Sequence, residues 1–519
     1  MPNSRPTVRE VSFEIFQHFG VDRLFGNPGS TELPMLKAMP EGFDYVLGLN
    51  EAVVVGMADG YARSSGKPAL VNLHSSAGTG HALGNLFTAF RNHAPIVVTA
   101  GQQARSILPY DPFLFAERPT EFPQPYVKWA CEPARPEDVP QALLRAFHIA
   151  LTPPMGPVFV SIPVDDWDRE CDRPGLPELH METLAAPHNI DLLARRFNRA
   201  SHPALVLGTG SADSHSWDSA IALAERSGAS VWVAPFAARD VFPEDHPQFA
   251  GFLPAMREDI VRLLDGHDMI LVAGAPVFTY HVEGEGPHWP PHATLAALSD
   301  TESHLAALPG DALGVLGSVA PALAALAEKV QPRAFAGSAH ALAAPEARMT
   351  DSYVLSRIAA LRPANAVVVE EAPTARGPMH DNLPILREGG FFTCASGGLG
   401  YGLPAAIGAA LGQNDKVLAV LGDGGAMYTI QGLYSARLHQ TDISFLILNN
   451  SAYAALQGFA SHFGMNSVPG TDLTGIDFVQ LAQAQGVAAR KVEETGDLDA
   501  ALEWSFAQDG PSLLDLRIT

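Results

Sequence analysis

The amino-acid sequence predicts an α/β protein of three domains, each a parallel β-sheet covered by helices. The chain has 519 residues, which is too many for a single hydrophobic core. Along most of that length, short apolar runs typical of buried strands alternate with longer helical patterns. Such alternation indicates βαβ units, in which helices join parallel strands and cover the sheet.

The composition excludes several other classes of protein. Hydrophobic residues make up 47% of the chain and charged residues 17%, which is typical of a globular enzyme. A formal net charge of −23 disfavours nucleic acids and anionic membranes as partners. Three cysteines without CxxC spacing indicate neither a disulfide framework nor a zinc site. Because neither a signal peptide nor a membrane span of roughly 18 apolar residues is present, we expect a soluble cytoplasmic protein.

The N-terminal domain is predicted over residues 1–172, and a linker rich in proline and polar residues follows at Cys171–His188. The expected elements of this domain are, in order, the helix VREVSFEIFQHFG, the strand VDRLFG, the turn and helix NPGSTELPMLKAM, the strand YVLGL, the helix EAVVVGMADGYARSSG, the strand PALVNL, the Gly-rich turn and helix HSSAGTGHALGNLFTAFRNH, and the strand PIVVTAG.

The central domain is predicted over residues 188–332, where helices such as NIDLLARRFNRA alternate with strands such as PALVLGTG and MILVAGAP. An Ala/Pro-rich stretch without a strand pattern, Gln331–Met349, is the expected second linker. The C-terminal domain is predicted over residues 350–519. It begins with the helix SYVLSRIAALR and the strand AVVVEE, and the Gly-rich segment FFTCASGGLGYGLPAAIGAALG follows.

One stretch of the C-terminal domain carries the clearest functional pattern. The strand Val417–Leu421, an acidic Gly-rich turn, a helix at about 430–438 and the strand Ile443–Leu448 follow one another. Such a βαβ unit brings the carboxyl ends of both strands to one edge of the sheet, where α/β proteins bind ligands. We therefore expect Asp423, after the first strand, to lie near Asn450, after the second.

These two side chains suit a hard cation. A carboxylate, an amide oxygen and a backbone carbonyl just beyond, from Ser451 or Ala452, form an all-oxygen set that Mg²⁺ or Ca²⁺ prefers. In the same turn, Gly424 and Gly425 let backbone N–H groups approach an anion, and the helix N-terminus behind them favours phosphate. The implied ligand is a metal-bridged diphosphate. The alternative is a structural turn without a metal.

This arrangement resembles a known cofactor motif. The sequence GDG followed by NN, with Asp423 and Asn450 27 positions apart, is similar to the thiamine diphosphate (ThDP) motif of the superfamily of 2-oxo-acid decarboxylases and acetolactate synthases. The segment LNEA also matches the superfamily. Taken alone, Glu51 is an acid at a helix N-terminus, which the helix dipole favours. The resemblance implies that its carboxylate bonds N1′ of the cofactor's aminopyrimidine and so helps to remove the thiazolium C2 proton.

The resemblance assigns further cofactor contacts. In CASGGLGYGLP, it implies that the Gly397 carbonyl accepts a bond from the 4′-amino group and that Leu399 holds the cofactor in its bent shape. Tyr453 is expected to reach the diphosphate. Thr374, in the turn EEAPTAR, is expected to offer a hydroxyl to phosphate. The alternative for CASGGLGYGLP is a Gly-rich turn with a core leucine.

Within the superfamily the chain resembles the benzoylformate decarboxylase family over nearly its whole length. The segments that carry the resemblance are FGNPGSTELP, LNEAVVVGMADGYA, VNLHSSAGTG, VTAGQQAR, VKWACEPA, PVDDWD, GAPVFTYH and GGLGYGLPAAIG. Three polar residues match the family's active site: Ser30, His74 and His281. On the residues alone, Ser30 suits a helix N-cap, His74 a hydrogen-bonding turn residue and His281 an exposed loop residue. The resemblance implies that Ser30 binds the substrate carboxylate and that the two histidines transfer protons.

An apolar pocket for an aryl group is expected from two segments. The resemblance places Phe113, Leu114, Ala455, Leu456 and Phe459 in its walls. The alternative for AALxxF, at helical spacing, is an ordinary core. The segment SILPYDPFLFAERPTE departs from the family pattern, so the resemblance does not fix the aryl preference.

These expectations combine into one reaction, the ThDP- and Mg²⁺-dependent decarboxylation of an aromatic 2-oxo acid, with benzoylformate giving benzaldehyde and CO₂. The thiazolium would act as the electron sink. The alternatives are another 2-oxo-acid decarboxylase, a carboligase or lyase of the acetolactate synthase or benzaldehyde lyase type, and a catalytically silent ThDP-binding protein. The resemblance implies a cofactor held between two chains, hence at least a homodimer, with a homotetramer as two such dimers.

Overall fold

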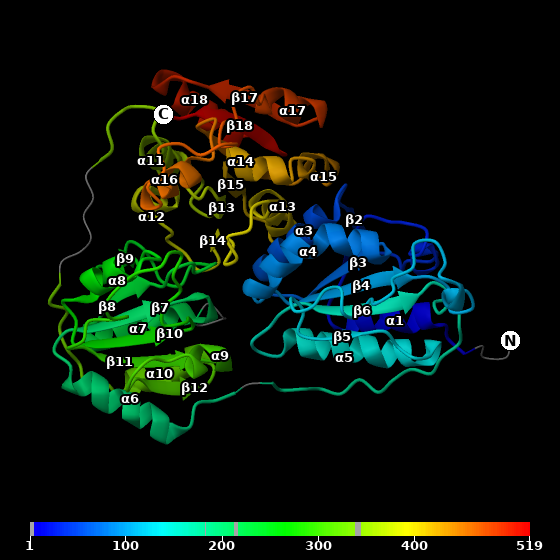
Figure 1. The fold of residues 1–519 in the computed structure, drawn as a ribbon, viewed down its shortest axis with the longest axis horizontal. Helices are drawn as coiled ribbons and strands as arrows, with labels where there is room; N and C mark the ends of the chain where they lie inside the picture. The colour runs from blue at the N-terminus through cyan, green and yellow to red at the C-terminus, as the bar shows by residue number, and fades with distance from the viewer. Residues whose placement is uncertain (1–4, 182, 212–215, 338–343) are drawn as a thin grey trace. The chain divides into compact units, whose positions relative to one another are not determined.

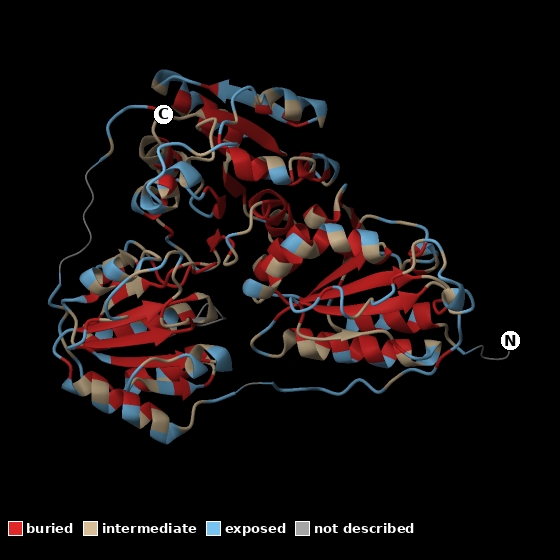
Figure 2. Cartoon of the chain, in the orientation of Figure 1, coloured by how far each residue is buried: buried red, intermediate tan, exposed pale blue. Residues whose placement is uncertain are grey.

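A computed structural model describes residues 5–181, 183–211, 216–337 and 344–519 and confirms the predicted fold class (Figure 1). Its parallel sheets are built from βαβ units in three separate stretches of the chain. The strands of all three sheets are largely buried, because helices cover both faces (Figure 2).

The chain forms two compact units. The first joins Met1–His180, Ala347–Arg376 and Ser396–Thr519, and the second joins Met181–Glu346 and Gly377–Ala395. The first unit therefore contains two of the predicted sheets, and the second contains the central one. The predicted domain limits stay predictions.

The N-terminal sheet of the first unit has the strand order β2-β1-β3-β4-β6-β5. Helices α1 and α5 share a hydrophobic core on one face, with Phe16 and Phe147 in contact, and α3 and α4 cover the other face. The elements are α1 (Val8–His18), β1 (Arg23–Gly26), α2 (Leu33–Leu36), β2 (Asp44–Leu47), α3 (Glu51–Ser65), β3 (Ala69–Leu73), α4 (Ser75–Arg91), β4 (Ile96–Gln102), β5 (Ala130–Cys131), α5 (Val139–Leu151) and β6 (Val158–Pro163).

The C-terminal sheet of the same unit contains the order β13-β15-β16-β18-β17. Its elements are α11 (Asp351–Leu361), β13 (Val367–Glu371), α13 (Gly402–Gly412), β15 (Val417–Gly422), α14 (Asp423–Tyr428), α15 (Gly432–Leu438), β16 (Ile443–Asn449), α16 (Ala454–His462), α17 (Phe478–Ala484), β17 (Ala488–Val492), α18 (Thr495–Phe506) and β18 (Ser512–Arg517). Strands β15 and β16 pair in parallel, with Gly422 opposite Leu448, so their carboxyl ends do reach the same edge.

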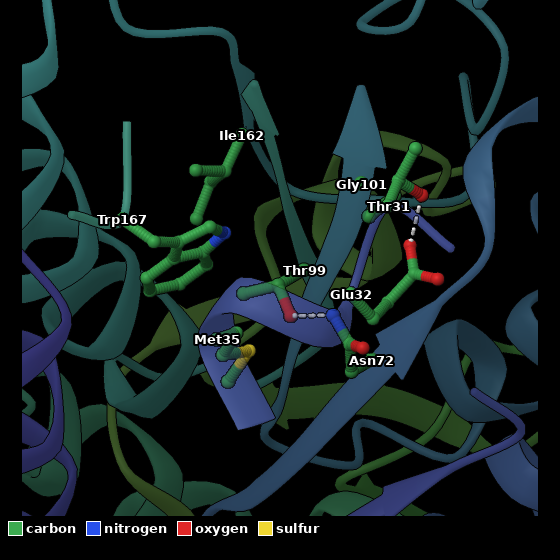
Figure 3. Close-up of a pocket in the computed structure, with 9 residues that line it drawn as sticks. Thr31, Glu32, Met35, Asn72, Thr99, Gly101, Ile162 and Trp167 are labelled. Atoms are coloured by element: carbon green, nitrogen blue, oxygen red, sulfur yellow. Dashed lines mark hydrogen bonds between the residues drawn. The ribbon is translucent and has the colours of Figure 1, made fainter. Parts of the chain in front are cut away.

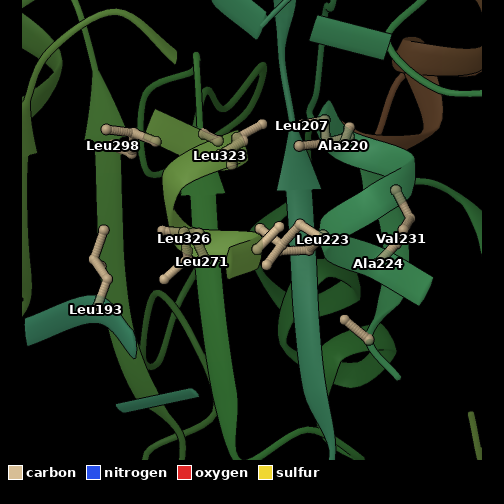
Figure 4. Packing of buried hydrophobic residues seen from close by; sticks show 14 of the residues in the cluster. Leu193, Leu207, Ala220, Leu223, Ala224, Val231, Leu271, Leu298, Leu323 and Leu326 are labelled. Atoms are coloured by element: carbon tan, nitrogen blue, oxygen red, sulfur yellow. The ribbon is translucent and has the colours of Figure 1, made fainter. Parts of the chain in front are cut away.

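The second unit has one sheet, in the order β12-β11-β10-β7-β8-β9. Alternate side chains of strand β7 enter opposite cores. Leu207 packs with α7 and α10 (Figure 4), as does Leu205, whereas Val206 packs on the face of α8. The elements are α6 (Pro187–Arg199), β7 (Pro203–Leu207), α7 (Ser216–Ser227), β8 (Ser230–Val233), β9 (Phe249–Phe252), α8 (Arg257–Leu264), β10 (Met269–Ala273), β11 (Thr294–Ser299), α9 (Glu302–Ala306), β12 (Leu313–Leu316), α10 (Val319–Lys329), α12 (Arg376–Asn382, of which Arg376 belongs to the first unit) and β14 (Phe391–Phe392).

Two predicted turns are helical. The Gly-rich segment after β3 is the first part of α4, and the acidic Gly-rich segment after β15 is the short helix α14. In both places tertiary packing overrides the weak helix propensity of glycine.

The first predicted linker lacks helices and strands except at its last two residues, because α6 begins at Pro187, and the second lacks them wherever the structure describes it; residues 182 and 338–343 lie outside the described ranges. No helix in the described part of the chain is long and apolar enough to span a membrane.

Helices α3 and α13 cross at very short range and join the two sheets of the first unit. A Cβ atom on Gly60 would lie 2.1 Å from the carbonyl oxygen of Ala405, and one on Gly408 would lie 1.9 Å from that of Met57. Next to the crossing, the buried Arg63 donates from Nη1 to the hydroxyl of Tyr401 at 2.5 Å. The crossing therefore fixes α3 against the loop that precedes α13.

Candidate active site

Asp423 opens α14 at the edge where β15 and β16 end. Its side chain is buried, and one carboxylate oxygen accepts a bond from the Gly424 amide at 2.8 Å. Burial raises the pKa of this carboxyl, and the backbone amides of Gly424 and of the 451–452 turn oppose that rise. The structure thus brings Asp423 close to the turn after β16.

That turn carries the other two predicted metal ligands. The side-chain oxygen of Asn450 accepts a bond from the Ala452 amide at 3.0 Å. Ser451 adopts a positive φ of 58°, and its carbonyl accepts from Leu473 at 2.8 Å. The turn is therefore held in one conformation from both sides.

The donor set fits a hard cation. The second oxygen of Asp423, Oδ2, is buried and has no hydrogen-bond partner within the described residues. A buried carboxylate oxygen without a donor is costly unless a cation neutralises it. No group of three or more His, Cys, Asp or Glu side chains suited to a metal occurs in the described ranges. The predicted metal ligands include only one side chain of these four types, Asp423, because the others are the amide oxygen of Asn450 and the carbonyl of Ala452. They would therefore not form a group of three such side chains.

The turn beside Asp423 packs closely against Tyr453, which is possible only because Gly424 lacks a side chain. A Cβ on Gly424 would lie 2.2 Å from the ring of Tyr453. Burial raises the pKa of the Tyr453 hydroxyl, so it stays a hydrogen-bond donor at neutral pH. The N-terminus of α14, the adjacent glycine amides and this hydroxyl are the features that suit a diphosphate.

Glu51 is the first residue of α3 and is buried, with 7% of its surface exposed. The side chain of Asn50 caps the helix by accepting from the Ala52 amide at 2.8 Å. The Glu51 carboxylate accepts from Asn27 Nδ2 at 3.3 Å and lies 3.0 Å from His81 Nδ1. His81 lies on the next helix and was not expected in the site.

The loop before α13 is tied to the start of α3. Asn85 Nδ2, on α4, donates to the carbonyl of Ala52 at 2.6 Å and to that of Gly400 at 3.0 Å. Thr88 Oγ1 lies 2.8 Å from Ser396 Oγ at the other end of the loop. Gly397 has a positive φ of 71° and is exposed, and Leu399 is half-buried.

His74 is the N-cap residue of α4, directly after β3, and its imidazole is held from one side. Nδ1 lies 2.9 Å from Glu32 Oε2 and 3.0 Å from Thr31 Oγ1. Glu32 also accepts from the hydroxyl of Thr31 at 2.5 Å (Figure 3) and from the Gly29 amide at 2.9 Å. Because Nδ1 is engaged, Nε2 is the ring nitrogen left for other partners.

Glu32 is a residue that the sequence analysis missed. Its side chain is fully buried beside a small gap that is lined by Asn72 and Thr99, which bond each other at 2.9 Å, and by the apolar side chains of Met35, Ile162 and Trp167 (Figure 3). A signal for it was available. Strands β1 and β3 are neighbours, with Gly26 opposite Asn72, so residues following both strands meet at one edge.

Ser30 lies in the turn between β1 and α2 and is exposed. Its expected role as an N-cap is wrong: the N-cap of α2 is Glu32, and the helix begins at Leu33. The turn is instead shaped by the bond from the Gly29 amide to Glu32. The hydroxyl of Ser30 is thus available for a role other than capping.

His281 belongs to the second unit, where its ring meets that of Phe236 edge-on with centroids 6.1 Å apart. Its amide donates to the carbonyl of Ala255 at 2.9 Å. In the first unit, Thr374 is exposed in the turn after β13. Glu51, His74, Asp423 and Asn450 all belong to the first unit, and the place of His281 in the active site stays a prediction.

The predicted pocket walls come from two segments of the first unit. Ser75 Oγ donates to the carbonyl of Leu114, which ties the first segment to the residue after His74. Phe113 is 86% exposed and Leu456 51% exposed in the isolated chain, and Ala455 and Phe459 are half-buried on α16. The gap beside Glu32 contains none of these residues and is not the expected aryl pocket.

Family comparisons match the chain in three consecutive parts. The N-terminal ThDP-binding domain of the thiamine pyrophosphate enzymes matches residues 6–123, the central domain of these enzymes matches 190–326, and the C-terminal ThDP-binding domain matches 377–516.

Individual relatives cover nearly the whole chain. A benzoylformate decarboxylase of Pseudomonas aeruginosa is 41% identical over 98% of both chains, whereas an acetolactate synthase large subunit of Escherichia coli is 27% identical over 98% of this chain and 94% of its own. Among solved structures, a 4-hydroxybenzoylformate decarboxylase of Rhodococcus jostii is 38% identical with a TM-score of 0.95, covering 99% of both chains. A benzoylformate decarboxylase of Polynucleobacter necessarius is 36% identical with a TM-score of 0.96, covering 99% of this chain and 98% of that one. The chain therefore belongs to the superfamily of thiamine diphosphate-dependent 2-oxo-acid decarboxylases and is a carboxy-lyase similar to benzoylformate decarboxylase.

Proposed function

We propose that the protein decarboxylates an aromatic 2-oxo acid without oxidation, with benzoylformate as a substrate, and that it requires Mg²⁺ together with ThDP. The observation that carries the proposal is the buried Asp423, whose Oδ2 has no partner within the described residues and lies at the edge that also holds the 450–452 turn. The aryl 2-oxo acids named for the relatives from P. aeruginosa and R. jostii support the choice of substrate.

When bound, ThDP supplies a nucleophilic carbon and an electron sink for the electrons released with CO₂. Asp423, the side chain of Asn450 and the carbonyl of Ala452 would hold the cation that neutralises the diphosphate. Gly424, Gly425 and Tyr453 would donate to the phosphate oxygens.

Glu51 would hold the proton shared with N1′ of the aminopyrimidine. Its burial at the start of α3 suits this task, because bulk water is kept away from the shared proton. The Gly397 carbonyl and the Leu399 side chain would orient the same ring. Because the cofactor would lie between two chains, one subunit would supply Glu51 and its partner the 397–402 loop. The bonds from Asn85 to Ala52 and Gly400 support a fixed placement of both segments within each chain.

His74 would move a proton through Nε2. Glu32 and Thr31 engage Nδ1 and so hold the ring in one orientation, which is what a proton donor to a developing alkoxide needs. Ser30 would bind the substrate carboxylate from the adjacent turn. His281 is proposed as the second proton-transfer residue, and Thr374 as a further phosphate contact.

An apolar environment would favour loss of the substrate's charged carboxylate by replacing the water around it. Phe113, Leu114, Ala455, Leu456 and Phe459 would provide that environment. The high exposure of Phe113 and Leu456 in the isolated chain is consistent with a wall that another subunit completes. We propose a homodimer as the minimal active form and a homotetramer as two such dimers.

The test is a turnover profile with ThDP and Mg²⁺ across benzoylformate, 4-hydroxybenzoylformate, pyruvate and a branched-chain 2-oxo acid. We expect benzaldehyde and 4-hydroxybenzaldehyde from the aryl acids at rates at least about ten times those on the aliphatic acids, a preference of the size that apolar burial of a ring supplies. Faster turnover of pyruvate, or acetolactate as the product, would contradict the aryl substrate and favour the acetolactate synthase type.

A further inference from the structure

A second buried acid lies between the two loops assigned to the cofactor. Glu371 is the last residue of β13 and is 2% exposed. One of its oxygens accepts from the Gly400 amide at 2.6 Å, and the other accepts from the Gly402 amide at 2.5 Å. The carboxylate therefore fixes the end of the loop that contains Gly397 and Leu399.

The same side chain also touches the turn after β15. A Cβ on Gly425 would lie 2.9 Å from the oxygen of Glu371 that bonds Gly400. A Cβ on Gly402 would lie 2.6 Å from the Cβ of Glu371. Only glycine at both positions lets the loop and the turn close around this carboxylate.

Burying a charged carboxylate at the position of Glu371 costs free energy. Burial raises the pKa of Glu371 to about 7, although the amides of Gly400 and Gly402 oppose the rise. The nearby Arg376 pairs instead with Glu370, at 3.0 Å, and no described ion pair includes Glu371. Burying an acid that accepts its hydrogen bonds from backbone amides costs stability, so those bonds must hold it firmly in place.

We propose that Glu371 is a positioning residue that fixes the 397–402 loop relative to the Asp423–Gly425 turn. This inference rests on the proposed function, because it takes the loop to orient the aminopyrimidine and the turn to bind the diphosphate. One side chain then sets the distance between the parts of the site that hold the two ends of ThDP. Glu371 would act through the backbone of the loop and not through a contact of its own with ThDP.

The test measures the ThDP dissociation constant of the whole protein by titration calorimetry with Mg²⁺. Glu371→Gln keeps the shape but offers one acceptor for two amides, so we expect the constant to rise about tenfold, as for loss of a charge-assisted bond. Glu371→Ala loses both bonds, and we expect a larger rise. Unchanged ThDP affinity in both variants would overturn the proposal.

Asp240 offers a matched control in the second unit. It is a buried acid that likewise accepts from two backbone amides, those of Gly389 at 2.9 Å and Phe391 at 3.2 Å. We expect Asp240→Asn to bind ThDP like the wild type. If it weakened ThDP as much as Glu371→Gln, general destabilisation would explain both results, and the positioning role would be overturned.

A double-mutant cycle separates positioning from a purely structural role. If Glu371 links the loop to the turn, the changes that Glu371→Gln and Gly425→Ala cause in the free energy of ThDP binding are not additive. Additive changes would overturn the proposed link. If Glu371→Gln does not fold, amide hydrogen exchange is measured in Gly425→Ala instead. Faster exchange at the Gly400 and Gly402 amides would support the link between loop and turn, and unchanged exchange would overturn it. Because these measurements follow binding, they stand even if no aryl 2-oxo acid is turned over.

Discussion

The imidazole Nδ1 of His74 lies 2.9 Å from a carboxylate oxygen of Glu32, which is fully buried behind it. The pair connects the ends of two neighbouring strands, β1 and β3, and leaves one ring nitrogen for chemistry. A hydrogen bond from the ring N–H to a buried carboxylate is a common way to fix the tautomer and orientation of a catalytic histidine.

Replacing Glu32 should therefore impair the chemical step more than binding. We expect Glu32→Ala to lower kcat by about 10²-fold through misplacement of His74, with a smaller change in KM. Thr31→Ser keeps the second hydroxyl partner and is the control, with kcat near that of the wild type. Steady-state kinetics on benzoylformate test this, and wild-type kcat in Glu32→Ala would show that the pair does not orient His74.

The crossing of α3 and α13 should tolerate no added methyl group. In Gly60→Ala the new Cβ would press on the Ala405 carbonyl, and we expect a loss of about 1–3 kcal/mol in the free energy of unfolding. Gly84 lies within α4 with nothing within 4 Å of a Cβ, so Gly84→Ala should be neutral or stabilising by up to about 1 kcal/mol. Urea midpoints compare the two. Equal stability of both variants would mean that the close crossing does not form.

The stability of the second unit should depend on pH through Asp240. Burial raises the pKa of this carboxyl from 3.8 to about 6 in the folded state. The folded state then binds a proton more tightly than the unfolded state, so the contribution of Asp240 is greatest below pH 4 and is lost as pH rises to about 6.

Relative to Asp240→Asn, the wild type should lose on the order of 3 kcal/mol of unfolding free energy between pH 4 and pH 6.5 and little more above that. Urea unfolding of both proteins across this range measures the difference. A difference that does not vary with pH, or that grows in favour of the wild type as pH rises, would show that Asp240 is not buried as described.

Much of the fold was predictable because buried parallel strands appear in the amino-acid sequence as short runs of apolar residues. Strand Val367–Glu371, for example, begins and ends almost where the pattern AVVVEE predicted. The convergence of Asp423 with the turn after β16 followed from the rule that parallel strands end at a common edge.

Other features were beyond the sequence because they depend on contacts between distant segments. The helices at Ser75 and at Asp423 contradict local glycine propensity, and in the second of them the close packing of Gly424 and Gly425 leaves no room for a side chain. The direction in which Glu32 and Glu371 point also comes from tertiary structure. Each stands beside a predicted site residue, but only the fold shows which partners its carboxylate accepts from.

The central claim is that a cation at Asp423 holds ThDP while Glu51 activates it, and calorimetric titration of ThDP with and without Mg²⁺ tests this most directly. We expect the wild type to bind ThDP only with a divalent cation, and Asp423→Ala to bind it at least about 10²-fold more weakly, as for loss of a charged metal ligand. Glu51→Gln should still bind ThDP but lose about 10²–10⁴-fold in kcat. Wild-type ThDP affinity in Asp423→Ala in the presence of a chelator would contradict the account.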